Sequence, residues 1–364
     1  MRLSMILSGY VARQVLLWLG LLFVGIAGLV FLLDIVEQLR KAAGKPDVTI
    51  GVVVQLSLLQ LPFLVQKTLP FMVLFGSMMA FWKLSRSNEL VIARAAGVSA
   101  WQFLLPAVLL GALVGGIQTT ALNPLAAAML ARFEKMDAEY MKRATSSLSI
   151  SPTGVWLRQG GGETQTVINA RRITPDGSEL LTVTFFNFEH PERFINRIDA
   201  ERARLRDGYW LIRDATISAP DETSRHVDSY RIATDLTLDR IQNSFASPET
   251  MSFWDIPAFL ETLTAAGFTG HRHLLYWHTL LAMPLLLAAM VLFAAVFTLK
   301  IGTRTSATRT IGAGVICSFL LYFASDIIYA MGLSGSIPAI LSAWSPAAIA
   351  TLLALAMVFH LEDG

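Results

Sequence analysis

The sequence predicts a polytopic α-helical membrane protein that carries one inserted all-β domain. Long hydrophobic segments occupy both ends of the 364-residue chain, and a single hydrophilic insert separates them. The insert, residues 132–273, holds 37 of the 56 charged side chains. It contains no cysteine, because the lone Cys317 lies in the C-terminal hydrophobic part. The insert must therefore fold around a hydrophobic core, without disulfides.

Six segments are long and apolar enough to cross a membrane, since one spanning helix needs about 20 residues. Residues 14–33, 95–131 and 274–299 carry no charge, and residues 48–82 carry only Lys67. Residues 48–82 suit one long tilted helix, because no hydrophilic turn divides them. Residues 310–361 contain one acid, Asp326, and a Gly/Ser/Pro-rich turn at 332–338 that separates two spans. We predict helices at about 12–37, 50–82, 99–124, 274–299, 307–332 and 338–360.

Basic residues next to the spans predict the orientation, because Lys and Arg are retained on the cytoplasmic side during insertion. They precede the first helix and fill the loops between helices two and three and between helices four and five. We therefore expect both termini in the cytoplasm and the insert outside. The first helix is too long for a cleaved signal peptide and is expected to remain as an anchor.

Short runs of β-branched and aromatic residues, separated by turn formers, predict strands in the insert. The runs are residues 155–157, 166–168, 180–188, 193–205, 209–217 and 230–238. Regular spacing of short strands favours a sandwich or a partly open barrel. Asp207-Gly208 predicts a tight type I′ hairpin turn, although an ordinary surface turn remains the alternative. Helical spacing predicts that residues 132–143 continue the third span and that residues 252–266 lead back to the fourth.

Catalytic motifs are absent from the sequence. There is no nucleotide-binding G-x-x-x-x-G-K-[ST] loop, no H-E-x-x-H, no C-x-x-C and no G-x-S-x-G. Two of His271, His273 and His278 could share a metal, but interfacial histidines are the more common case. The net charge of +2 gives no reason to invoke nucleic acid. We expect no catalytic residue, no cofactor and no metal in this chain.

The loop between the second and third helices predicts a short surface helix at about 85–97. Cap-capable Ser and Asn begin it, helix formers continue it and Gly97 ends it. Leu90, Val91 and Ala95 can form one apolar face, with Glu89 and Arg94 on its flank. One interpretation is a generic interfacial helix. The other is a coupling helix that presses into a groove of a peripheral ATPase.

This loop, Ser-Asn-Glu-Leu-Val-Ile-Ala-Arg-Ala-Ala-Gly at 87–97, resembles the LptF/LptG family of lipopolysaccharide export permeases, as does the preceding Leu69-Pro-Phe segment. The layout of three helices, a β-rich insert and three helices resembles the family as well. Two further segments, Asp34 to Lys41 and Ser325 to Pro338, look more like LptG than LptF. The resemblance covers nearly the whole chain.

The resemblance implies a permease subunit of an ABC-type complex in the bacterial inner membrane, with a jellyroll-like periplasmic domain. Its implied partners are an LptF-like permease, a cytoplasmic LptB-like ATPase dimer, a periplasmic bridge of LptC-like and then LptA-like proteins, and lipopolysaccharide itself. The chain would occupy the membrane as residues 1–131 and 274–364, with residues 132–273 in the periplasm. The residues implied to meet the ATPase are Ser87, Asn88, Glu89, Leu90, Arg94 and Gly97.

By the same resemblance, basic residues where the first helix leaves the outer leaflet would bind the phosphorylated headgroup. Arg40 and Lys41 match the family's basic cluster, but Asp34 stands where LptG can carry a further base. Lys45 or Lys67 could substitute for that base. For each of these cations, ordinary phospholipid contact is the alternative.

Asp326 is the least expected residue in the membrane portion, since an ionisable group within a span tends to face the bundle interior or a wet cavity. It could equally be solvated near the outer interface, because the fifth helix ends soon after it. Its position in the sequence leaves both interpretations open.

Two other classes of function are compatible with the sequence. A mechanotransmitting permease-like protein would use the same coupling loop to move an extracytoplasmic domain by ATP hydrolysis, without lipid passing between its helices. A sensor would read a ligand with the β domain, but the short inner loops and tails leave no room for a cytoplasmic output domain.

Overall fold

A computed structural model describes residues 5–362 with gaps, and it divides them into two compact units. The gaps are residues 44, 46–47, 88, 90–91, 93–94, 96–98, 141–146, 152–153, 160–163, 175–178, 190–192, 221–222, 235–246, 266–269 and 300–306. One unit comprises Met1–Glu134, Ser252–Trp254 and Leu274–Gly364, and is called the membrane unit here. The other comprises Lys135–Met251 and Asp255–His273, and is called the β unit.

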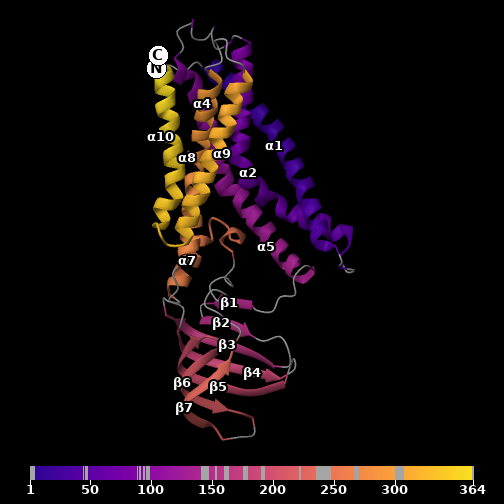
Figure 1. Cartoon of the computed structure of the whole chain (residues 1–364), viewed down its shortest axis with the longest axis vertical. Coiled ribbons are helices and arrows are strands. Elements are labelled where there is room, and N and C mark those ends of the chain that lie inside the picture. Colours follow the sequence, from indigo (N-terminus) through magenta and orange to yellow (C-terminus); the bar gives the residue numbers. More distant parts are fainter. Residues whose placement is uncertain are drawn as a thin grey trace. The chain divides into compact units, whose positions relative to one another are not determined.

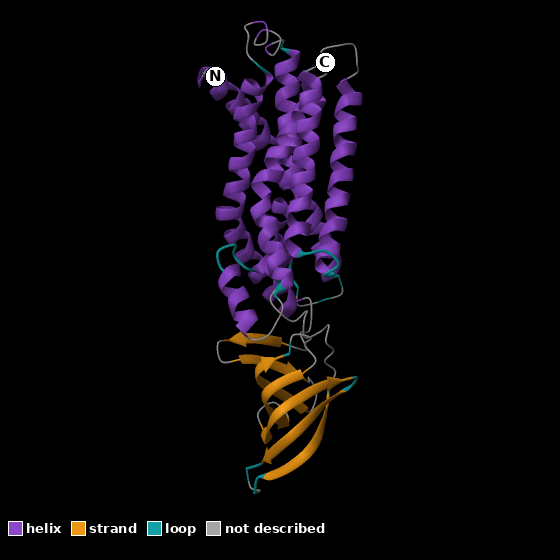
Figure 2. Cartoon of the chain, turned by 90° about the vertical axis from the view of Figure 1, so that its left-hand side faces the viewer, coloured by secondary structure: helices purple, strands orange, loops and turns teal. Residues whose placement is uncertain are grey.

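Six helical segments of the described chain are long and apolar enough to cross a membrane, which confirms the predicted polytopic helical protein. Figures 1 and 2 show the helices running alongside one another. The segment predicted at 50–82 is one helix, although it contains Pro62 and Pro70. The helices are α1 (Met5–Ala42), α2 (Ile50–Arg86), α4 (Ala100–Ile117), the π-helix η1 (Gln118–Leu122), α5 (Asn123–Tyr140), α8 (His271–Leu299), α9 (Ala307–Leu333) and α10 (Ala339–Glu362).

Capping side chains set the starts of α2 and α4. The hydroxyl of Thr49 accepts a hydrogen bond of 3.4 Å from the backbone N–H of Val52. Ser99 forms a complete capping box, because its hydroxyl accepts from the Gln102 backbone while the Gln102 side chain accepts from the Ser99 backbone. Each cap satisfies amide groups that the first helical turn leaves without a partner.

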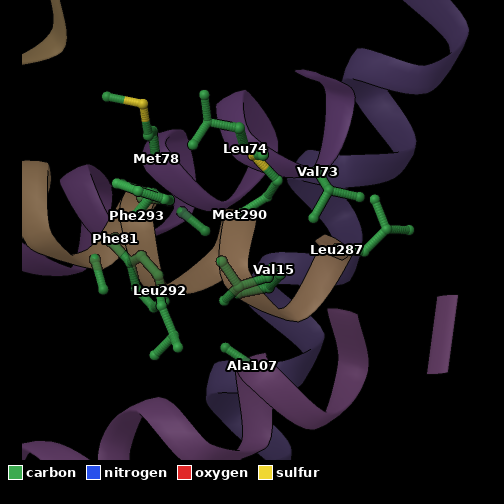
Figure 3. Packing of buried hydrophobic residues seen from close by; sticks show 14 of the residues in the cluster. Val15, Val73, Leu74, Met78, Phe81, Ala107, Leu287, Met290, Leu292 and Phe293 are labelled. Carbon is green, nitrogen blue, oxygen red and sulfur yellow. The ribbon is translucent and has the colours of Figure 1, made fainter. Parts of the chain in front are cut away.

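Helix α8 is the most buried of the candidate spans in the described chain, and Figure 3 shows some of its side chains packed among those of α1, α2 and α4. In its most apolar window, 61% of the α8 residues are buried, against 11% in each of α1 and α9. Val15, Phe81, Ala107 and Phe293 bring α1, α2, α4 and α8 into one cluster. The outer helices α1 and α9 therefore leave most of their apolar surface uncovered by this chain.

Glycines allow α4 and α8 to approach closely. A Cβ atom added at Gly115 would lie 2.5 Å from the Cα atom of Pro284, and one at Gly111 would lie 2.7 Å from Val291. Small residues at such contacts bring helix backbones together, which favours association by van der Waals packing within a membrane. The sequence of α4 is therefore matched to the surface of α8.

The β unit contains a seven-stranded antiparallel sheet in the order β1-β2-β3-β4-β5-β6-β7, which confirms the inserted all-β domain. The described strands form a meander, in which each pairs with its sequence neighbour, whereas a jellyroll also pairs strands that are distant in sequence. Strand β1 was not predicted, and β7 begins at residue 225 rather than 230. The strands are β1 (Ser147–Ser151), β2 (Gly154–Gln159), β3 (Thr164–Ile173), β4 (Glu179–Glu189), β5 (Arg193–Arg206), β6 (Tyr209–Ser218) and β7 (Arg225–Ala233).

The sheet curls, so that β2 reaches the end of β7 although four strands lie between them. The side chain of Gln159 on β2 donates a hydrogen bond of 3.2 Å to the carbonyl of Ala233, and its oxygen accepts from the indole N–H of Trp210 at 3.3 Å. Trp210 is fully buried beside Phe185, at the centre of the β-unit core. Figure 2 shows the curl. This arrangement fits the predicted partly open barrel better than a flat sheet.

The hairpin at Asp207-Gly208 differs from the type I′ turn that the sequence suggested. Arg206 pairs with Tyr209, so the loop has two residues as expected. Only Gly208, with φ of +84°, has the left-handed conformation, because Asp207 is not among the described residues with positive φ. A type I′ turn needs positive φ at both positions, and Asp207 avoids the steric cost of that conformation.

The segment after the strands forms a short 3-10 turn, Pro248–Thr250, and then helix α7 (Ile256–Ala265). Ile256 and Leu263 form its buried face. Before the strands, α5 extends to Tyr140, as the continuation of the third span predicted. Residues 175–178, between β3 and β4, lie outside the described residues.

Candidate functional site

Two polar clusters lie at the two ends of α1, and they contain four of the described residues to which the sequence assigned a function, namely Arg40, Lys41, Ser87 and Glu89. The first, called the ion-pair cluster, consists of Glu37, Arg40 and Lys41 in the last turns of the helix. The second, called the N-terminal polar cluster, consists of Tyr10, Gln14, Lys83, Ser87 and Glu89. Tyr10 and Gln14 come from the start of α1, and the other three come from the end of α2 and the segment after it.

The ion-pair cluster is a bidentate contact on the helix surface. Nε and Nη2 of Arg40 donate to the two carboxylate oxygens of Glu37 at 2.9 and 2.8 Å. Nζ of Lys41 lies 3.8 Å from the same carboxylate. The Arg40 side chain is 76% exposed, so solvent screens the ion pair. Another anion can therefore readily replace the Glu37 carboxylate. Two cations and one carboxylate leave one net positive charge at this end of α1.

The structure separates the other predicted cations from one another. Lys45 lies in the loop after α1, where its backbone N–H donates to the carbonyl of Ala42 at 3.0 Å. Lys67 lies 17 residues into α2, about 25 Å along the helix from its start. Its ammonium group sits 4.7 Å from the ring centre of Phe63. Lys45 is thus close in sequence to Arg40 and Lys41, whereas Lys67 lies deep in the second span.

Asp34 lies on a different face of α1 from Arg40 and is 9% exposed. Gln38, one turn later on the same face, is fully buried and donates a hydrogen bond of 3.0 Å to Gln60 of α2. Oδ2 of Asp34 and Oε1 of Gln38 are buried oxygens with no hydrogen-bond partner among the described residues. Asp34 therefore lies on the buried face of α1 that it shares with Gln38, not in the exposed ion-pair cluster.

Asp326 is exposed on α9, about 10 Å along the helix before its end at Leu333. The neighbouring Tyr322, Phe323 and Ile327 are exposed as well. Its side chain therefore does not face the interior of this chain's own helix bundle. The interpretation that Asp326 points into that interior is wrong. A wet cavity bordered by another chain and the outer interface both remain compatible with the position.

The N-terminal polar cluster joins α1 to the end of α2. With its amide oriented toward the two donors, the side-chain oxygen of Gln14 accepts from Nζ of Lys83 at 2.9 Å and from the Trp18 indole at 3.1 Å. The hydroxyl of Ser87 donates to Oε1 of Glu89 at 2.8 Å. The phenol of Tyr10 on α1 lies near the Glu89 carboxylate. Glu89 is thus held by a hydrogen bond from its own segment.

Only part of the predicted coupling helix can be placed. Ser87 and Glu89 are described, whereas Asn88, Leu90, Arg94 and Gly97 lie outside the described residues. Tyr10 and Gln14 were not predicted as site residues. The sequence signal that could have indicated them is their spacing, because Tyr10 and Gln14 lie one helical turn apart and therefore share one face of α1.

A third polar network, also not predicted, surrounds the π-helix η1. The amide of Asn123 donates to the Tyr276 hydroxyl at 3.1 Å, and its oxygen accepts from the backbone N–H of Phe253 at 2.8 Å. The indole of Trp254 donates to the carbonyl of Thr120 at 3.1 Å. A π-helix leaves backbone carbonyls out of the regular ladder, and Trp254 takes one of them. The network holds Phe253 and Trp254 against the other helices of the membrane unit.

The histidines considered as metal ligands have other surroundings. Nδ1 of His278 accepts a hydrogen bond of 3.3 Å from the Trp344 indole. The His273 ring packs against Phe259 with 5.0 Å between ring centres. Within the described ranges, no three His, Cys, Asp or Glu side chains gather as a metal site would require.

Six apolar spans and an inserted antiparallel sheet define a polytopic membrane protein with one extramembrane β domain. A family model described as "Lipopolysaccharide export system permease LptF/LptG" matches residues 9–359. The lipopolysaccharide export system permease protein LptG of Escherichia coli strain K12 is 23% identical over 358 residues, which cover 96% of this chain and 97% of that protein. LptG of Escherichia coli strain CFT073 matches with the same identity and coverage. The chain belongs to the LptF/LptG family and is LptG-like.

Proposed function

We propose that this chain is the LptG-like permease subunit of an ABC-type lipopolysaccharide export complex. It extracts lipopolysaccharide from the periplasmic leaflet of the inner membrane and passes it toward a periplasmic bridge for delivery to the outer membrane. A separate cytoplasmic ATPase supplies the energy, so this chain binds and moves lipid without catalysing a reaction. The observation that carries the proposal is the family match over residues 9–359, supported by relatives that align over almost their whole length.

In this proposal residues 1–131 and 274–364 form the membrane part and residues 132–273 the periplasmic domain. Both termini are cytoplasmic. An even number of spans supports this arrangement, because six crossings return the chain to the side on which it began. The distribution of Lys and Arg next to the spans supports a cytoplasmic location for that side.

The uncovered apolar faces of α1 and α9 favour the presence of a second permease beside this one. Leu21, Val24 and Phe323 are examples, each more than 60% exposed in the isolated chain. Helices that are buried so little by their own chain require lipid or another subunit around them. We propose that an LptF-like permease completes an apolar cavity with these faces, which receives the acyl chains of lipopolysaccharide.

The ion-pair cluster supplies the cations for the headgroup in this scheme. Arg40 offers a planar pair of N–H donors that matches a phosphate group, and Lys41 adds a point charge. A doubly charged phosphate would displace the Glu37 carboxylate from Arg40, because the existing pair is exposed and weak. Lys45 and Lys67 stay proposals as further lipid contacts, and Asp326 stays a candidate residue at the border of the cavity.

Glu89 and its loop are proposed to meet the ATPase, together with Ser87, Asn88, Leu90, Arg94 and Gly97. The wider chain of partners consists of an LptB-like ATPase dimer, an LptC-like bridge protein and then an LptA-like one. Neither nucleic acid nor a bound cofactor enters the scheme.

The test is to purify the chain with its ATPase and its partner permease, and to analyse bound lipid by mass spectrometry. Lipopolysaccharide should be enriched over the phospholipids of the same membrane. An unrelated six-span protein purified in the same detergent provides the control for carry-over. A complex that retains the ATPase and hydrolyses ATP, but holds no more lipopolysaccharide than the control, would instead indicate a mechanotransmitting protein without lipid passage.

A further inference from the structure

Trp254 lies outside the six spans, yet it belongs to the membrane unit together with Ser252 and Phe253. The chain before and after these three residues belongs to the β unit. The Trp254 side chain is 61% exposed, although tryptophan carries one of the largest apolar surfaces of any side chain. Phe253 beside it is only 9% exposed. The exposed indole therefore needs a partner that this chain does not supply.

The one polar atom of the Trp254 side chain is already occupied. Nε1 of the indole donates a hydrogen bond of 3.1 Å to the carbonyl of Thr120, an exposed residue of the π-helix η1. A π-helix takes backbone carbonyls out of the regular ladder, and hydrocarbon contains no water that could satisfy them. Trp254 supplies the missing donor from the protein. What it leaves exposed is the apolar surface of the ring.

An exposed apolar ridge runs along the same span toward Trp254. Four large aliphatic side chains follow one another at a spacing of four residues, and each is more than a third exposed. They are Leu105, Leu109, Leu113 and Ile117. Side chains at i and i+4 are neighbours on a helix surface, so these four form a continuous ridge. Trp101 precedes the ridge by the same spacing, and Thr120, which contacts Trp254, follows it.

The length of this ridge matches the thickness of a membrane. Trp101 and Thr120 are 19 residues apart in the sequence, which is about 28 Å along a helix axis. The hydrocarbon core of a bilayer is about 30 Å thick. Tryptophan is enriched at the two interfaces between membrane and water, where an amphipathic ring is most favourable. Trp101 and Trp254 thus have the spacing of the two boundaries of one bilayer.

Other aromatic residues surround Trp254 at this end of the membrane unit. The Phe253 ring lies edge-on to Trp254 with 5.0 Å between ring centres, and it stacks on Trp277 of α8 at 6.0 Å. The Trp277 ring lies 5.1 Å from His278, whose Nδ1 accepts from the indole of Trp344 on α10. Three tryptophans from three separate segments are therefore connected, an arrangement typical of the aromatic belt at a membrane interface.

We propose that Ser252–Trp254 is a membrane-interface anchor, in which the Trp254 ring lies among the headgroups and first acyl carbons of the surrounding phospholipids. The sequence placed these residues in the hydrophilic insert, whereas the proposal assigns them to the bilayer surface. The anchor fixes the depth of η1, because a tryptophan ring is less favourable in water or in deep hydrocarbon than at the interface. It requires only that the six spans lie in a bilayer, so it is independent of lipopolysaccharide transport.

The test measures tryptophan fluorescence of the full-length protein in phosphatidylcholine vesicles without lipopolysaccharide. The lipids carry quenching bromine atoms either near the headgroup or near the end of the acyl chain. Wild-type emission minus that of Trp254→Phe isolates the signal of Trp254. The same subtraction with Trp101→Phe gives the matched control at the other end of the span. We expect shallow bromines to quench most of the Trp254 signal and deep bromines to quench less, as for Trp101, while iodide in the water quenches little.

A second measurement does not depend on the phenylalanine variant. Trp254→Cys and Asp255→Cys, each in a Cys317→Ser background, are labelled in the same vesicles with a water-soluble maleimide. Both positions are exposed in the structure, so a difference in rate reports the surroundings rather than burial by the chain. The thiol at position 254 should react several-fold more slowly than the thiol at position 255.

Three results would overturn the anchor. Quenching of Trp254 by iodide but not by brominated lipid, together with equal labelling rates, would place the ring in water. Protection from iodide and from both lipids would show that another protein chain covers Trp254. Stronger quenching by deep bromines than by shallow ones would place the ring in the hydrocarbon core instead of at its boundary.

Discussion

The side-chain oxygen of Asn123 accepts a hydrogen bond of 2.8 Å from the backbone N–H of Phe253, 130 residues later in the chain. The same side chain donates to the Tyr276 hydroxyl, so one buried amide joins the start of α5, the returning chain and α8. Asn123 follows the π-helix η1, where α4 passes into α5. A single polar side chain thus connects three segments of the membrane unit.

Replacing Asn123 with alanine should destabilise the protein by about 2–4 kcal/mol, because it leaves the buried Phe253 N–H without its acceptor and removes the hydrogen bond to the Tyr276 hydroxyl. Thermal unfolding in detergent measures the effect as a lower Tm. Tyr276→Phe should cost less, about 1 kcal/mol, since it breaks only one of the two bonds. Equal Tm values for Asn123→Ala and wild type would show that water replaces the network.

Adjacent glycines in α4 should respond in opposite ways to alanine. A Cβ at Gly115 would meet the backbone of Pro284 at 2.5 Å, whereas one at Gly116 would have nothing within 4 Å. Gly115→Ala should therefore cost about 1–3 kcal/mol through overpacking. Gly116→Ala should be neutral or stabilising by up to about 1 kcal/mol, from the higher helix propensity of alanine. The yield of folded protein and its Tm compare the two variants, and similar values would contradict the close packing of α4 against α8.

Substituting Gln159 with leucine should loosen the curl of the β unit. The change keeps the volume of the side chain but removes the bonds to Ala233 and to the buried Trp210 indole, at a cost of about 1–3 kcal/mol. Hydrogen–deuterium exchange should become faster in peptides from β2 and β7. Arg202→Gln, at an exposed position on the same sheet, provides the control. Unchanged protection of β2 and β7 would show that Gln159 does not hold the curl.

Binding of lipopolysaccharide should respond to each member of the ion-pair cluster. Charge-assisted phosphate contacts contribute about 1.5–3 kcal/mol each and less when exposed, so the Arg40→Ala, Lys41→Ala double variant should bind roughly tenfold more weakly. Glu37→Gln should bind up to about fivefold more tightly, because it removes the anion that competes for Arg40. Arg13→Ala, at the other end of α1, is the control. Quantitative photo-crosslinking in the assembled complex measures lipopolysaccharide capture by wild type and by the three variants. Wild-type capture by the double variant would leave Arg40 and Lys41 as ordinary boundary charges.

Reversing the charge at Glu89 should weaken association with the ATPase while leaving the membrane protein folded. An exposed segment tolerates Glu89→Lys, but a docking groove that matches a carboxylate does not. The yield of co-purified ATPase is the measurement, and the Tm of the permease verifies folding. Unchanged ATPase yield together with unchanged transport would remove Glu89 from the coupling role.

The sequence by itself determined the fold class, because composition decides which segments can enter a membrane. Uncharged stretches of 20 or more residues, such as residues 14–33, fit only the bilayer, and residues 132–273 carry too much charge to do so. Runs of β-branched and aromatic residues between turn formers were enough to predict strands such as residues 193–205, in which Ile198 and Ala200 share one buried face. The family was likewise readable from the loop at 87–97 and is shown by the match over residues 9–359.

Only the tertiary structure decided which residues work together. Asn123 and Phe253, and Gln159 and Ala233, are each joined by a hydrogen bond between segments far apart in the chain, and local periodicity carries no record of such pairs. It also placed Asp34 and Lys67 away from the exposed cations of the ion-pair cluster, because the face of a helix that is buried depends on the helix packed against it. Secondary structure follows from short-range preferences and hydrophobicity, whereas the partners of a polar side chain follow from the way in which the helices and strands pack.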